Sequence, residues 1–93
     1  MRIVGVPEHF NIPIDTAAKA KAFGEVTKEA VEFVEVNGGS GAMISGLRSG
    51  DYDMTVELTE CLVTANLPAG DVSIIGTYVQ SPLRWGVFVS PEA

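Results

Sequence analysis

A glycine-rich stretch at residues 37–42 carries the residue types best suited to hold a ligand. It reads Asn37-Gly38-Gly39-Ser40-Gly41-Ala42 and stands between a strand-like run, residues 30–36, and a helix-like run, residues 43–49. Glycines that lead a strand into a helix let a ligand approach the backbone, where the N–H groups of the first turn have no partner. The stretch therefore predicts a cradle for an anionic or carbonyl group, although such glycines also serve turns and close helix packing.

Two phosphate-binding motifs fail at this stretch. A dinucleotide fingerprint needs a third glycine three residues after Gly41, where the chain has Ile44. A Gly-Lys-Ser or Gly-Lys-Thr sequence occurs nowhere in the chain. Rossmann-type and P-loop chemistry are therefore disfavoured.

The remaining reactive side chains favour binding over catalysis. His9 is the only histidine, which excludes a multi-histidine metal site. Cys61 is the only cysteine, so no internal disulfide can form, and we interpret it as a small buried thiol. Glu57 and Glu60 lie three residues apart and could face the same way, and at least one of them is interpreted as a carboxylate at a helix start, where the helix dipole favours it. We expect no catalytic group, no metal and no cofactor.

Length and charge limit the class of protein. The 93 residues predict a single domain, 1–93. The net charge of −6 without a basic cluster argues against nucleic acid and anionic membranes as partners. The apolar runs are far shorter than the roughly 20 residues of a membrane span, and no signal-peptide pattern opens the chain. We expect a cytoplasmic protein, or a periplasmic one whose signal has been removed.

Strand-like and helix-like runs alternate along the sequence and predict an α/β fold. Such alternation gives a mostly parallel sheet with helices on both faces, in the order β-α-β-α-β-α-β-β. The joint Gln80-Ser81-Pro82 is too short for a parallel crossover, so the last strand is expected to run antiparallel. The predicted strands are residues 2–6, 30–36, 53–56, 72–79 and 83–89. One predicted helix begins at the Asn11 cap, and a third spans residues 59–67. The second begins at the Ser40 cap and stops at Gly50, and Gly46 inside it indicates a close approach to the sheet.

The predicted sheet brings three loops to one end. Ligands of open α/β sheets bind beyond the carboxyl ends of the strands. The loops there would be residues 7–11, 37–42 and 57–61. They offer an imidazole and an aromatic ring, backbone donors with a hydroxyl, and carboxylates with a hydroxyl and a thiol.

Several segments together resemble one lobe of the type 2 periplasmic-binding-protein fold. The closest branch is similar to the nitrate/sulfonate/taurine-type solute-binding proteins, including fungal homologues without an export signal. The thiamine-pyrimidine synthases are more distant. The segments are Val6-Pro7-Glu8-His9-Phe10, Ser40-Gly41-Ala42-Met43-Ile44, Gly50-Asp51-Tyr52-Asp53, Leu58-Thr59-Glu60, Gly76-Thr77-Tyr78-Val79 and Ser81-Pro82-Leu83-Arg84-Trp85.

The resemblance implies a small-molecule site and a second lobe. Family members have two α/β lobes, and this chain matches only the first. The ligand contacts implied are His9, Phe10, Ser40, Gly41, Ala42, Thr59 and Glu60. The chain departs from the family at Ala22, where a glycine is common, and at Glu57, where a small residue is frequent. A carboxylate at Glu57 would repel an anionic ligand.

Three functions follow as hypotheses. The first is a binding module for a polar or anionic solute, of the kind that serves ABC transporters. The second is an enzyme related to the pyrimidine synthases, in which His9 is consumed or acts as a base; the lone cysteine and the lack of a metal cluster argue against it. The third is an assembly-prone lobe whose apolar final strand, residues 85–89, drives self-association into a symmetric dimer.

Overall fold

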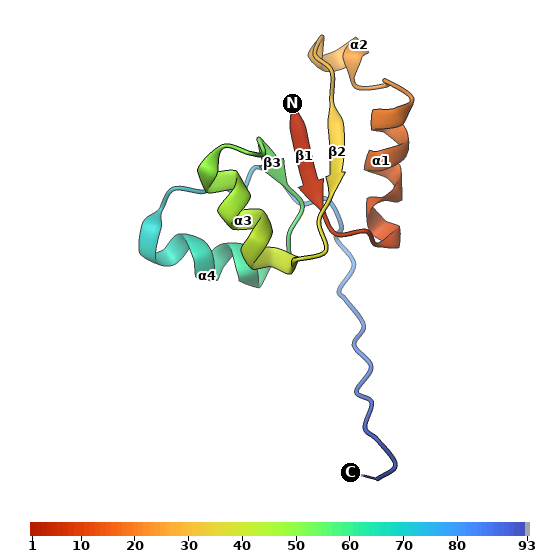
Figure 1. Ribbon diagram of the computed structural model, residues 1–93, viewed down its shortest axis with the longest axis vertical. Helices are drawn as coiled ribbons and strands as arrows, with labels where there is room; N and C mark the ends of the chain where they lie inside the picture. Colours follow the sequence, from red (N-terminus) through yellow and green to blue (C-terminus); the bar gives the residue numbers. More distant parts are fainter. Residues whose placement is uncertain (93) are drawn as a thin grey trace.

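The computed structural model describes residues 1–92, apart from the side chains of residues 66–68. It is an α/β fold with a small parallel sheet, as predicted (Figure 1). The elements are β1 (Arg2–Gly5), a 3-10 turn η1 (His9–Asn11), α1 (Ile12–Lys19), α2 (Gly24–Thr27), β2 (Glu32–Glu35), α3 (Gly39–Ser49), β3 (Met54–Thr55) and α4 (Thr59–Ala69).

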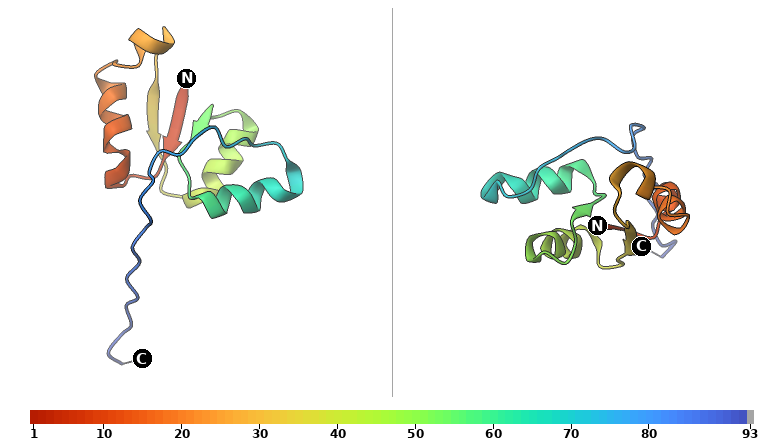
Figure 2. Two further views of the ribbon diagram at one scale, coloured as in Figure 1. Left: turned by 180° about the vertical axis from the view of Figure 1, so that it is seen from behind. Right: turned by 90° about the horizontal axis from the view of Figure 1, so that it is seen from above.

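The first strand lies at the centre of the sheet. The strand order is β2-β1-β3, and both pairs are parallel. Val4 pairs with Val34 on one side and with Thr55 on the other, and it is fully buried. The connection from β1 to β2 and the connection from β2 to β3 cross the sheet in opposite directions. Right-handed crossovers then place α1 and α3 on opposite faces (Figure 2).

The start of α1 is fixed by a buried amide. We predicted Asn11 as the helix cap, but its side chain makes no capping hydrogen bond. Instead Asn11 Nδ2 donates to the carbonyl oxygen of Val6 at 2.8 Å, and the residue is 2% exposed. A Cβ on Gly5, the last residue of β1, would lie 2.7 Å from Asn11 Nδ2, so a larger residue there would displace this amide. The amide therefore ties the loop after β1 to the strand instead of capping the helix.

The second predicted helix begins earlier than its sequence pattern indicates. The residue that caps α3 is Gly38, so Ser40 lies inside the first turn and the prediction of Ser40 as the cap is wrong. The predicted stop is confirmed, since Gly50 has φ 82° and ends the helix in the left-handed region. A Cβ on Gly46 would clash with the ring of Tyr52. The close neighbour of Gly46 is therefore this ring and not the sheet, as we had expected.

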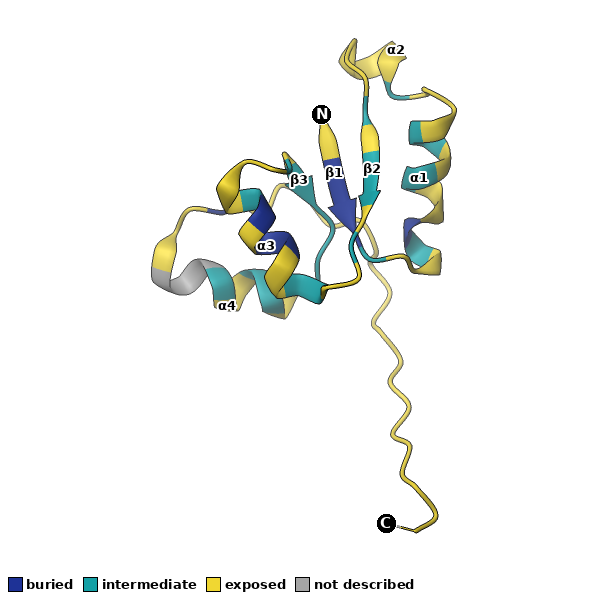
Figure 3. Ribbon diagram, in the orientation of Figure 1, coloured by how far each residue is buried: buried dark blue, intermediate teal, exposed yellow. Residues whose placement is uncertain are grey.

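The two predicted C-terminal strands are absent. Residues 71–76 run past β3 but form no strand, and only Val72 among residues 71–92 is buried (Figure 3). Residues 77–92 then leave the body as an extended tail (Figure 1). The chain does not fold back at residues 80–82, so the antiparallel last strand is not formed. The physical reason is the lack of a partner: β3 has two residues, too few to hold a further strand against it.

Candidate functional site

The strand order defines where a ligand is expected. Because the connections diverge from β1, the general rule for such sheets places a ligand at the carboxyl end of β1, between the loops that leave it and its neighbours. All three loops lie at this end (Figure 1). The structure places the predicted residues in them: His9 and Phe10 in η1, Ser40, Gly41 and Ala42 in the first turn of α3, and Thr59 and Glu60 in the first turn of α4.

A partly buried carboxyl group forms the polar centre of this end. Glu57 follows β3, and its Oε1 accepts a hydrogen bond from Thr55 Oγ1 at 3.4 Å. The hydroxyl group of Ser40 lies beside the same carboxylate. Burial raises the pKa of Glu57, and these two hydroxyl groups lower it by less. Its Oε2 atom is buried and has no hydrogen-bond partner among the described residues. The site therefore contains a carboxyl group whose ionised form is disfavoured by burial and whose Oε2 lacks a hydrogen-bond partner among the described residues.

The fold requires glycine at some positions of residues 37–42 and not at others. Gly39 has φ +76°, a conformation that favours glycine. A Cβ on Gly38 would lie 2.9 Å from the Cβ of Ala42. Gly41 has neither constraint: it lies in a helix, it is exposed, and a Cβ there would meet nothing within 4 Å. Since glycine weakens a helix relative to alanine by roughly 0.5–1 kcal/mol, the fold itself gives no reason for Gly41.

The first turn of α3 is short of acceptors. No side chain caps its N–H groups, and none of its residues is acidic. A helix start of this kind attracts carbonyl and anionic groups. Glu57 is the carboxylate that reaches it, through Ser40. An ionised Glu57 therefore complements the dipole of α3 and opposes a second negative charge beside it.

His9 lies at a different hollow, whose lining does not include Phe10. The rings of His9 and Phe10 meet edge to face with centroids 5.5 Å apart. His9 lines a hollow of about 270 Å³ together with Asn11, Asp15 and Glu35. The lining of this hollow does not include Ser40, Gly41, Ala42, Thr59 or Glu60. The structure thus gathers Ser40 with Glu57, and it does not bring His9 and Ser40 into one lining.

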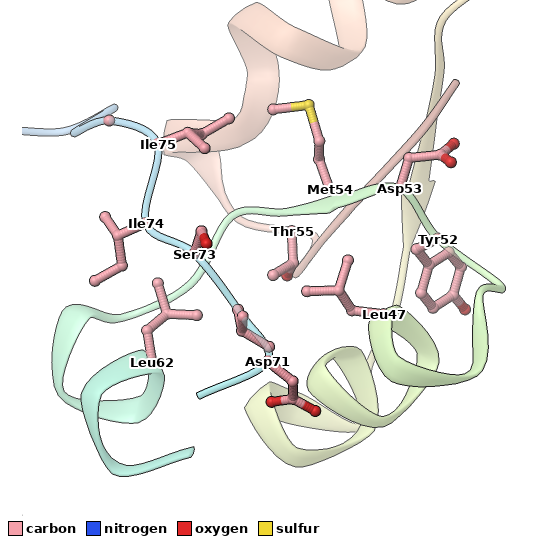
Figure 4. A pocket seen from close by; sticks show the side chains of 12 residues that line it. Leu47, Tyr52, Asp53, Met54, Thr55, Leu62, Asp71, Ser73, Ile74 and Ile75 are labelled. Carbon is pink, nitrogen blue, oxygen red and sulfur yellow. The ribbon is translucent and has the colours of Figure 1, made fainter. Parts of the chain in front are cut away.

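A larger hollow lies beside β3, where no site was predicted. It measures about 530 Å³ and lies between β3, the end of α3, α4 and residues 71–76 (Figure 4). Met54, Leu62 and Ile74 contribute apolar side chains to it. One side of it is formed by residues 71–76, part of which was predicted to be a strand over residues 72–79 that does not form. Within residues 1–92, no three His, Cys, Asp or Glu side chains are grouped so that they could hold a metal ion.

Comparison with protein-family models, with curated protein sequences and with solved structures finds no match to this chain. Among the helices of residues 1–92, none is both long and apolar enough to cross a membrane. The site therefore has to be interpreted from its own geometry.

Proposed function

We propose that this chain is a small-molecule-binding α/β domain, one lobe of a protein similar to the nitrate/sulfonate/taurine-type solute-binding proteins. The ligand lies at the carboxyl end of the sheet, against the first turn of α3. It is captured without chemical change. A second lobe would close over it from the opposite side.

Gly41 is the observation that carries this proposal. It is a helical glycine that neither backbone conformation nor packing requires, in the first turn of α3, where no capping side chain takes up the N–H groups. A side chain there would cover those donors. The strand order supports the same location, since the crevice of a sheet of this order opens beside it.

The chemistry around Gly41 favours a neutral polar solute with a carbonyl group. The N–H groups of α3 donate to the carbonyl oxygen, and the Glu57 carboxylate accepts from a donor on the same molecule. Because the Glu57 carboxylate lies beside the ligand, its negative charge repels an anion. A sulfonate or carboxylate would bind once Glu57 is protonated. The ligand class is thus set by the charge of one residue.

A thermal-shift screen tests the proposal. Neutral amides and matched carboxylates, at constant ionic strength and pH 7, are compared for their effect on the melting temperature. We expect a neutral solute to raise it, and Gly41→Val to abolish that rise. Gly24→Val is the matched control, because Gly24 lies at the start of α2 and also has no atom within 4 Å of an added Cβ. A rise that survives Gly41→Val, or the absence of a rise with every solute, would overturn the proposal.

A further inference from the structure

The turn between β2 and α3 is held by neither of these elements (Figure 1). Just beyond β2, the amide nitrogen of Val36 still donates to the carbonyl oxygen of Gly5 at 3.0 Å. Helix α3 begins at Gly39. Asn37 and Gly38 lie between these two points, and both are exposed. Among the residues that the structure describes, no hydrogen bond involves the side chain of Asn37 or the N–H group of Gly38.

The residue types of this turn have a chemistry of their own. Asparagine is a thermolabile residue. In the reaction responsible, the amide nitrogen of the next residue attacks the side-chain amide carbon and closes a five-membered ring. Glycine has no side chain to hinder that approach, and its backbone is the most permissive. Asn37-Gly38 is the only asparagine-glycine pair in the chain.

The packing of the turn preserves this pair. A Cβ on Gly38 would lie 2.9 Å from the Cβ of Ala42, so a larger residue at position 38 is disfavoured. The next residue, Gly39, has φ +76°, which also favours glycine. The two residues that follow Asn37 therefore both lack a side chain, and its amide carbon stays open to attack.

The other two asparagines of the chain lack these features. Asn11 is 2% exposed, and its Nδ2 donates to the carbonyl oxygen of Val6 at 2.8 Å. Ile12 follows it, and the branched side chain of isoleucine hinders the attacking nitrogen. Asn66 lies within α4 and is followed by Leu67. Both asparagines are therefore comparisons within the same molecule.

We propose that Asn37 is a site of self-modification, at which the amide nitrogen of Gly38 closes a succinimide ring that water opens to aspartate or isoaspartate. The nitrogen loses its proton to solvent and bonds to Cγ of Asn37. The bond from Cγ to Nδ2 breaks, and ammonia leaves. Water then adds to one ring carbonyl group: addition at Cγ gives aspartate, and addition at the main-chain carbonyl carbon gives isoaspartate. The net reaction consumes one water and releases one ammonia, without an oxidant or a reductant.

Both products alter the chain just before α3. Aspartate adds a carboxylate ahead of the first turn, which has no acidic residue and no capping side chain. The helix dipole favours a negative charge at this place. Isoaspartate leads the main chain through the side-chain carbons, so the connection from β2 to α3 becomes one carbon longer. An effect on ligand capture rests on the proposed function, whereas the modification itself does not.

Ageing of the native full chain tests the proposal. The protein is incubated in mildly alkaline buffer and digested, and each asparagine-containing peptide is measured by mass spectrometry. An isoaspartate-specific methyltransferase is the second probe. We expect the peptide of Asn37 to lose its amide and to accept methyl groups, whereas the peptides of Asn11 and Asn66 keep their amides. Asn37→Gln is the matched variant: ring closure there needs six members, so methyl acceptance is lost.

Hydroxylamine gives an independent readout, because it attacks the succinimide and divides the chain. We expect fragments 1–37 and 38–93 from the unsubstituted protein and an intact chain from Asn37→Gln. Two results would each overturn the proposal. An amide of Asn37 that persists in the native chain and is lost only in urea would show that the turn prevents ring closure. Conversion to aspartate without methyl acceptance or cleavage would show direct hydrolysis by water, without attack by Gly38.

Discussion

Arg48 of α3 holds Asp71 with two parallel hydrogen bonds, Nε to Oδ2 at 2.9 Å and Nη2 to Oδ1 at 3.0 Å. The same guanidinium donates to the carbonyl oxygen of Ala65 in α4 at 2.9 Å. One side chain therefore ties α3, α4 and the segment that follows α4. This pairing fixes the wall of the hollow beside β3, because Asp71 begins that wall.

Neutralising Asp71 should loosen this wall. The hydrogen bonds from Arg48 lower the pKa of Asp71, so the folded state favours its ionised form. The stabilisation is present above the ordinary carboxyl pKa of about 4 and is lost as the pH falls through the lowered value. We expect Asp71→Asn to unfold at a lower temperature at pH 7 and to match the unsubstituted chain at the acid limit. Melting curves from pH 7 to pH 2 measure this. Glu25→Gln on α2 is the control, because it removes an equal charge. Its melting temperature should equal that of the unsubstituted chain at each pH.

Glu57 should have the opposite dependence on pH. Its pKa is raised by burial, so the folded state binds the proton more tightly than the unfolded state does. Stability relative to a neutral residue is therefore full below the unfolded pKa and declines as the pH rises through the folded value. We expect Glu57→Gln to stabilise the protein at pH 7, because the amide removes the charge that burial disfavours. Urea unfolding at pH 7 and pH 4 measures it, and a gain that is larger at pH 4 would contradict this account.

Two glycines of one loop should respond differently to alanine. Gly41→Ala meets open space and should stabilise α3 by about 0.5 kcal/mol. Gly38→Ala brings the new Cβ within 2.9 Å of the Cβ of Ala42 and should destabilise the fold. Chemical denaturation of both variants in one buffer separates the two effects. Stabilisation by both substitutions would show that the loop relaxes around position 38.

Gly46 and Tyr52 should behave as a coupled pair. A Cβ on Gly46 clashes with the Tyr52 ring, and overpacking of this kind costs about 1–3 kcal/mol. We expect Gly46→Ala to be destabilising by that amount, and to cost much less in a Tyr52→Ala background. The double-mutant cycle of unfolding free energies measures the coupling. Purely additive effects would place the ring elsewhere in solution.

The sequence predicts the first two thirds of this fold well, because its signals there are local. The β-branched run of β1 and the Gly50 stop each act through their own backbone, and both are confirmed. The errors arise where distant residues decide. Asn11 has the residue type of a cap, yet the carbonyl oxygen of Val6 takes its side chain. Residues 72–79 have the pattern of a strand, but a strand needs a partner edge, and no local pattern reveals whether one exists.

The candidate site was predicted in part for the same reason. The parallel sheet makes the place of the three loops predictable, since every strand–helix loop of such a sheet opens at one end. The proximity of Ser40 to Glu57 was not predicted, because it depends on the relative positions of α3 and the end of β3 in the folded chain. Glu57 was singled out as a rim charge, and its raised pKa was not foreseen. The separate hollow of His9 depends on the packing of η1 against α1.

The central place of β1 has a consequence for the order in which the sheet is built. The strand made first is the one that both others need, and its partners come about 30 and about 50 residues later along the chain. Strand β1 therefore remains an unpaired apolar segment during part of synthesis, since translation proceeds at about 5–20 residues per second. The sheet grows outward from its oldest strand, and each new strand closes a longer loop than the one before it. During those seconds, a chaperone that recognises short apolar segments could bind β1 before β2 and β3 pair with it.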